Sequence, residues 1–154
     1  MTRVLALVAV LAAAAATPAG AQNAEIASLW RGGIASAGEL LRHPSLVPVL
    51  DRILGARIAA YRAATARPGA LTRHMGKILV GTGCAAAGCA AGGAFVVADT
   101  QRGEVLVVLA APERTAPDRA GPRRFERFAT AGFPMESESV AKALAAWQER
   151  FGSR

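Results

Sequence analysis

Two cysteines are the side chains of this sequence most suited to covalent chemistry. Cys84 and Cys89 enclose four residues that carry no functional group. The N-terminus, described below, predicts export, and two cysteines of an exported protein usually pair in an oxidising compartment. Glycine and alanine allow so short a ring to turn. We therefore expect a disulfide that closes a loop, whose other members are Ala85, Ala86, Ala87 and Gly88.

Other chemistries of the same cysteines are alternatives. A redox dithiol is more typically spaced C-x-x-C. A zinc site needs two further ligands, for which the sequence offers only His43 and His74, without a recognisable spacing. Cys84 could act as a nucleophile with His74 as its base, but no third partner is evident. The closed loop remains the favoured interpretation, and we expect no metal, no cofactor and no catalytic residue.

The N-terminus indicates the compartment. Arg3 precedes an uncharged apolar run over residues 4–16, and small residues follow up to Ala21. This pattern is typical of a secretory signal peptide, and the apolar run is too short to cross a bilayer. A membrane anchor is the alternative. We expect residues 1–21 to be removed on export to a bacterial periplasm, leaving a single domain over residues 22–154.

A disulfide over so short a loop rigidifies the loop more than it holds a fold together. Loop closure of this length removes about 2 kcal/mol of chain entropy from the unfolded state. The loop is therefore suited to presenting a fixed backbone shape, although a purely structural disulfide that binds nothing is the alternative.

The basic charge has two interpretations. The formal charge is +7, and sixteen of the 18 basic residues are arginine. The neutral interpretation is that a GC-rich genome encodes many arginines. The functional interpretation is that the positive charge attracts anionic lipid or glycan. In the densest basic stretch, residues 119–128, arginines alternate with two phenylalanines, as they would on a surface that binds nucleic acid. The expected compartment and the lack of a nucleic-acid motif argue against that interpretation. We therefore favour a solvated edge whose two phenylalanines belong to the core. The basic-patch candidates are Arg119, Arg123, Arg124 and Arg127.

Helices must occupy the first half of the exported chain. Apolar residues recur at helical spacing over residues 23–42, although Gly32 and Gly33 weaken this helix. Pro44 enforces a break, and a stronger amphipathic pattern covers residues 45–65. The segment 66–70 reads as a loop.

The period then changes to that of a sheet. Residues 77–80 read as a strand running into the cysteine loop, and residues 94–98 and 105–109 read as a β-hairpin around a polar turn. Both hairpin strands are too apolar to be solvated on two faces, so we expect helices to cover one side of the sheet. The fold class is α+β with an antiparallel sheet.

A loop or irregular edge and a helix complete the chain. Proline and arginine dominate residues 111–134, whereas residues 135–152 predict a helix with acidic residues near its start. Trp147 is best interpreted as core and not as a ligand platform. It shares one helical stripe with Val140, Leu144 and Phe151.

The order of helical region, strand, C-x4-C loop and hairpin resembles the inhibitor of vertebrate lysozyme (Ivy) family of bacterial periplasmic proteins. The matching core is residues 77–109, KILVGTGCAAAGCAAGGAFVVADTQRGEVLVVL. The family's loop reads Cys-Lys-Pro-His-Asp-Cys and enters the active-site cleft of lysozyme, where its histidine and acidic residue make the inhibitory contacts. The resemblance implies a central antiparallel sheet flanked by helices, no catalysis, and a homodimer.

Only the two cysteines of that motif carry over. Alanines and a glycine replace the polar residues between them, so the side chains of this loop cannot bond to catalytic carboxylates. A carboxylate left unpaired in a buried cleft costs about 1–3 kcal/mol per unmade bond. The usual animal lysozymes are themselves strongly basic, so a basic partner would be repelled at long range.

The sequence is therefore compatible with two functions. The first is a non-enzymatic inhibitor that presents its closed loop to a lysozyme or another muramidase of the cell envelope. The alternative is an envelope protein that binds anionic lipid or glycan through its arginines, which salt would weaken. An enzyme has little support, because the stretch GTGCAAAG lacks the lysine and Ser/Thr of a P-loop. We expect no nucleic-acid partner and no transmembrane helix.

Overall fold

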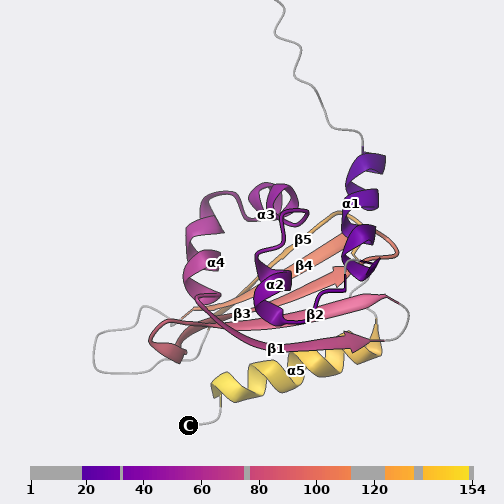
Figure 1. The fold of residues 1–154 in the computed structure, drawn as a ribbon. Helices are drawn as coiled ribbons and strands as arrows, with labels where there is room; N and C mark the ends of the chain where they lie inside the picture. The colour runs from indigo at the N-terminus through magenta and orange to yellow at the C-terminus, as the bar shows by residue number, and fades with distance from the viewer. Residues whose placement is uncertain (1–18, 32, 75–76, 112–123, 134–136, 153–154) are drawn as a thin grey trace, which may run out of the picture.

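The fold is a five-stranded antiparallel sheet with helices on both faces (Figure 1). The computed structural model describes residues 19–31, 33–74, 77–111, 124–133 and 137–152. Within them the strands follow one another across the sheet in chain order. The elements are α1 (Ala19–Arg31), α2 (Ala37–Leu41), α3 (Val47–Leu54), the 3-10 helix η1 (Gly55–Arg57), α4 (Ile58–Ala64), β1 (Arg67–His74), β2 (Ile78–Ala85), β3 (Gly88–Asp99), β4 (Glu104–Ala111), β5 (Arg124–Ala129) and α5 (Glu138–Gly152).

Helices cover both faces of the sheet, whereas the apolar pattern of the hairpin strands predicted them on one face. Helices α1–α4 lie on one face and α5 on the other (Figure 1). The central strands alternate between the two layers: Ala94 and Val96 pack against α1–α4, while Phe95 and Val97 pack against α5. A strand buried on both faces reads as a continuous apolar run, which is the pattern that β3 and β4 show.

Two glycines divide the helices predicted in the first half. The segment 23–42 is split at Gly33, with φ 67°, into α1 and α2. The segment 45–65 is split at Gly55, with φ 49°, into α3 and the η1–α4 pair. Both φ values lie in the left-handed region, which glycine adopts without a steric penalty. Both segments are helical, as predicted, but each is divided into shorter helices and does not form one continuous helix.

The two outer strands are the parts that the sequence did not predict. The segment 66–70, predicted as a loop, contains the start of β1, which pairs with β2 despite Pro68. Residues 124–129, inside the predicted loop or irregular edge, form β5 against β4. In β5, Phe125 packs in the α5 layer and Phe128 in the α1–α4 layer.

The C-terminal helix and its buried stripe are confirmed. Trp147 is 5% exposed and its ring centroid lies 5.6 Å from that of Phe95, 5.8 Å from that of Phe125 and 4.7 Å from that of Phe151. These three contacts join Trp147 to β3, to β5 and to a second residue of α5. Trp147 is therefore the centre of an aromatic cluster that fixes α5 on the sheet.

A partly buried carboxyl at the start of β4 gives a pH-dependent prediction. Burial raises the pKa of Glu104, Arg102 opposes this rise and Asp99 adds to it. Its Oε2 atom is buried without a hydrogen-bond partner among the described residues. The pKa of Glu104 is higher in the folded state than in the unfolded state, so the protonated carboxyl favours folding. This contribution to stability is complete below the unfolded pKa of about 4.3 and is lost as the pH rises through the folded pKa.

Glu104→Gln should therefore be more stable than the parent protein at pH 7, by less than about 1 kcal/mol, and equal to it near pH 4. Urea unfolding at both pH values measures this difference. The exposed Glu25, which forms no ion pair among the described residues, provides the control substitution Glu25→Gln. A difference that stays constant between the two pH values would contradict the assignment.

Candidate functional site

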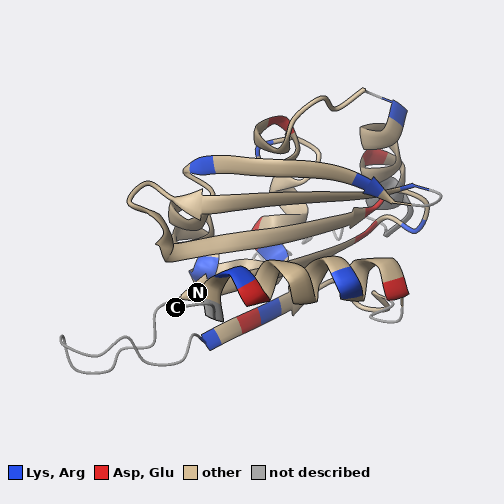
Figure 2. Ribbon diagram, turned by 90° about the horizontal axis from the view of Figure 1, so that it is seen from below, with Lys and Arg blue, Asp and Glu red and all other residues tan. Residues whose placement is uncertain are grey.

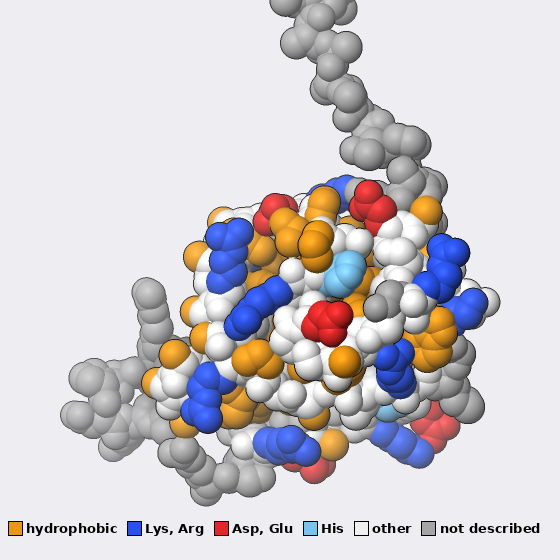
Figure 3. All heavy atoms as spheres, in the orientation of Figure 1, with side chains coloured by type: hydrophobic (Ala, Val, Ile, Leu, Met, Phe, Trp, Pro, Cys, Tyr) orange, Lys and Arg blue, Asp and Glu red, His pale blue; other side chains and the backbone are white. Residues whose placement is uncertain are grey.

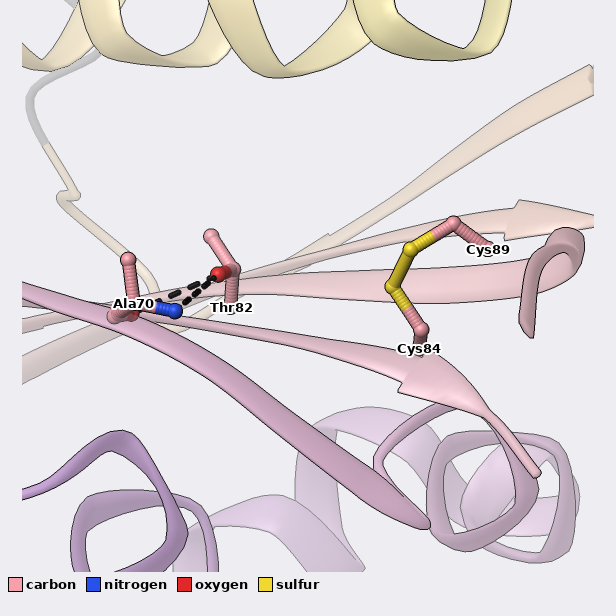
Figure 4. Close-up of a disulfide and its surroundings, with 4 residues drawn as sticks. All are labelled: Ala70, Thr82, Cys84 and Cys89. Atoms are coloured by element: carbon pink, nitrogen blue, oxygen red, sulfur yellow. Dashed lines mark hydrogen bonds between the residues drawn. A yellow bond between two sulfur atoms is a disulfide. The ribbon is translucent and has the colours of Figure 1, made fainter.

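The predicted disulfide is present at the tip of the β2–β3 hairpin. Cys84 and Cys89 are bonded, with their Cα atoms 4.6 Å apart (Figure 4), within the usual range for disulfides. Neither cysteine has a free thiol, so the nucleophile and metal alternatives do not apply to this state. The suggested base His74 also lies at the other end of β1 from Arg67, the residue that pairs with Cys84.

A glycine and a change of register shape the hairpin tip. Gly88 has φ 104°, and an added Cβ would find nothing within 4 Å, so backbone conformation and not crowding requires glycine. Ala85 pairs with Gly88, whereas Cys84 pairs with Gly93. Residues 89–92 therefore form a bulge in β3, which the disulfide ties back to β2.

The closed hairpin presents only methyl groups and backbone. The turn residues Ala86 and Ala87 are exposed, as are Cys89, Ala90 and Ala91. Residues 78–98 contain no charged residue, so both strands of the hairpin and the turn that joins them are tan in Figure 2 as far as Asp99. Recognition by this tip must therefore use shape and the peptide N–H and C=O groups.

A side-chain hydrogen bond holds the edge strand against the hairpin. The Thr82 hydroxyl accepts the Ala70 N–H at 3.0 Å (Figure 4) and also lies 3.3 Å from the Ala70 carbonyl. The register of β1 shifts between Pro68 and Leu71. An added Cβ on Gly69 would lie 2.6 Å from the Thr82 hydroxyl, so only glycine leaves room for this bond.

The base of the hairpin is held between two helical layers. An added Cβ on Gly93 would lie 2.6 Å from the Phe151 ring of α5. On the other face, an added Cβ on Gly83 would lie 3.0 Å from the Cα of Thr65, just after α4. Both glycines let a helix approach the strand backbone directly. The aromatic cluster around Trp147 therefore supports the hairpin from below.

Two arginines near the hairpin were not singled out in the sequence. The exposed Arg67 is paired with Cys84 across β1 and β2. Arg57 forms an ion pair with Glu126 at 2.6 Å and lines a groove of 180 Å³ together with Ala85 of the hairpin. No local signal could have found them, because pairing between distant segments brings both to this end of the sheet.

The structure does not bring the described members of the predicted basic patch together. Arg119 and Arg123 lie outside the described residues. Arg124 lies 4.0 Å from Glu126 on the α1–α4 side, while Arg127 lines a pocket against α5. Residues three apart in a strand point to opposite faces. Arg124 and Arg127 therefore share a strand but not a surface, and the patch as a whole stays a prediction.

These observations define a small α+β protein with a rigid, disulfide-closed hairpin. Residues 48–150, more than half of the chain, match the family described as inhibitor of vertebrate lysozyme (Ivy). The chain belongs to this family, which confirms the resemblance seen in the sequence. No curated protein and no solved structure matches the chain.

Neither a metal cluster nor a membrane span emerges from the described part of the chain. Those residues contain no group of three or more His, Cys, Asp or Glu side chains that could hold a metal ion. Their helices include none that is long and apolar enough to cross a membrane.

Proposed function

We propose that this protein is an exported, non-enzymatic inhibitor that docks its closed hairpin, residues 84–89, on a lysozyme or another muramidase of the cell envelope. Membership of the Ivy family supports an inhibitor. The observation that carries the proposal is the exposed, uncharged hairpin tip, closed by a disulfide and held between two helical layers.

The hairpin docks through its backbone. A tip of alanine and glycine is narrow enough to enter a cleft, and its peptide groups can bond to polar groups there. The disulfide fixes the tip before binding, which reduces the entropy lost on association. The exposed Arg67 supplies a cation beside the tip. This mode differs from the histidine and acid contacts of the family's usual loop.

Export accounts for the disulfide. Disulfides persist in oxidising compartments such as the periplasm, and residues 1–21 have the pattern of a signal peptide. Ile26 and Leu29 of α1 are fully buried in the core. Cleavage after Ala21 would keep both in the mature domain, residues 22–154.

The test is a cell-wall lysis assay with oxidised mature protein against animal c-type lysozyme and bacterial envelope muramidases. We expect inhibition of at least one of them. Cys84→Ser/Cys89→Ser should weaken it by about tenfold or more, because the tip then loses its fixed shape. Unfolding measured in parallel should show a loss of about 2 kcal/mol, which leaves the domain folded.

The absence of inhibition of every muramidase at micromolar protein would overturn the proposal. The closed hairpin would then be structural. Binding to anionic vesicles that falls as ionic strength rises would support the arginine-based alternative instead.

A further inference from the structure

A second candidate site lies in the helical layer that faces the viewer in Figure 3. A cavity of 330 Å³ opens among α2, α3 and α4. Pockets that bind small molecules have volumes of about 300–1,000 Å³. Figure 3 shows hydrophobic side chains over this part of the molecule with Lys and Arg side chains beside them.

The walls of the cavity are apolar. Leu50 and Ile58 line it from α3 and α4, and Val47 lies at its mouth with 43% of its surface exposed. Tyr61 contributes its ring, because its hydroxyl is already bound to the Leu41 carbonyl at 2.8 Å. A hydrocarbon chain would lose its water here without burying an unpaired polar group of the protein.

The cations that line the cavity are free to take an anion. Arg42 and Arg62 both line it, and neither has a carboxylate within salt-bridge distance among the described residues. Arg42 lies close enough to Tyr61 to oppose the rise that burial causes in the tyrosine pKa. Asp51 is the single acidic residue of the lining. The lining therefore carries one net positive charge, and guanidinium groups bind carboxylates through paired N–H donors.

We propose that this cavity binds one molecule of a free single-chain carboxylate, with its hydrocarbon chain along Leu50 and Ile58 and its carboxylate at Arg42 and Arg62. A site for an amphiphilic molecule needs apolar walls for the hydrocarbon chain and unpaired cations for the carboxylate, and this cavity has both. The site uses none of the residues of the closed hairpin, so it is independent of muramidase inhibition.

The experiment titrates the oxidised protein with hexanoate, octanoate and decanoate below their micelle concentrations, by isothermal calorimetry. We expect saturable one-to-one binding that tightens about fourfold per added methylene until the cavity is full. Arg42→Gln and Arg62→Gln should each weaken decanoate binding by about fivefold or more. Val47→Trp should block the mouth.

Substitution of Asp51 tests whether the ligand is bound as an anion. Asp51→Asn should tighten decanoate binding, because it removes the one negative charge of the lining. Arg102→Gln, at an exposed turn of the sheet, is the matched control and should leave the affinity unchanged. All five replaced side chains are exposed, so the variants keep the core, which circular dichroism verifies.

Several outcomes would overturn the proposal. Equal weakening by Arg102→Gln, or an affinity that does not depend on chain length, would indicate attraction to the surface charge alone. Weaker decanoate binding by Asp51→Asn would contradict the placement of the carboxylate at Arg42 and Arg62, beside Asp51 in the lining. Binding to anionic vesicles that Val47→Trp removes, without decanoate binding, would indicate a lipid still held in a bilayer.

Discussion

Replacing Trp147 with alanine should lower the free energy of unfolding by about 3–5 kcal/mol. The indole is 5% exposed and contacts three other aromatic rings. Its removal takes away buried apolar surface and leaves a cavity whose walls belong to β3, β5 and α5. These elements are fixed by the sheet, so the cavity cannot close by a small shift. Urea unfolding followed by circular dichroism measures the change.

Trp30→Ala is the matched control for this loss. Trp30 is only partly buried, and its ring carries the Arg73 guanidinium 5.2 Å from its centroid. An exposed cation–π pair contributes about 0.5–1 kcal/mol, so the control should lose much less than Trp147→Ala. Equal losses at the two positions would contradict the central place of Trp147. Faster amide exchange in the hairpin of Trp147→Ala would further show that the cluster supports the tip.

Ala87→Trp should weaken muramidase inhibition by about 100-fold or more while leaving unfolding unchanged. Ala87 is an exposed turn residue with negative φ, so a larger side chain meets no steric or conformational obstacle in the free protein. In the complex, the indole would stand between the narrow tip and the walls of the cleft. The lysis assay and a thermal melt measure the two effects separately.

Ala131→Trp provides the control for added bulk. Ala131 is also an exposed alanine in a turn, directly after Thr130, which bonds Val105 at the start of β4. This variant should inhibit as the parent protein does. Unchanged inhibition by Ala87→Trp would show that the partner is bound elsewhere on the molecule.

Local patterns predicted the centre of the fold. Strict helical spacing gave α5 with its stripe from Val140 to Phe151, and the polar turn between two apolar runs gave the β3–β4 hairpin. The disulfide was predicted from the expected export and from the presence of only two cysteines in the sequence. These features depend on residues that are close together in the chain, so they could be predicted from the sequence.

Pairing between distant segments decided the rest. Pro68 and Gly69 have no strand preference, and β1 exists because the neighbouring β2 offers hydrogen bonds and Thr82 fills its bulge. The same pairing brings Arg67 beside Cys84. The cavity at Arg42 and Arg62 needs the packing of three helices, which no single stretch encodes.

The outer strands also govern how the protein behaves at high concentration. An exposed strand edge can recruit a further strand from another molecule and start aggregation. Here one edge carries Pro68 and a bulge, and the other carries the exposed Arg124 and Arg127. Proline removes a donor, and charged side chains on an edge strand must lose water before a further strand can pair with it. Growth of the sheet therefore stops at β1 and β5, and self-association through amyloid-like strand addition is disfavoured.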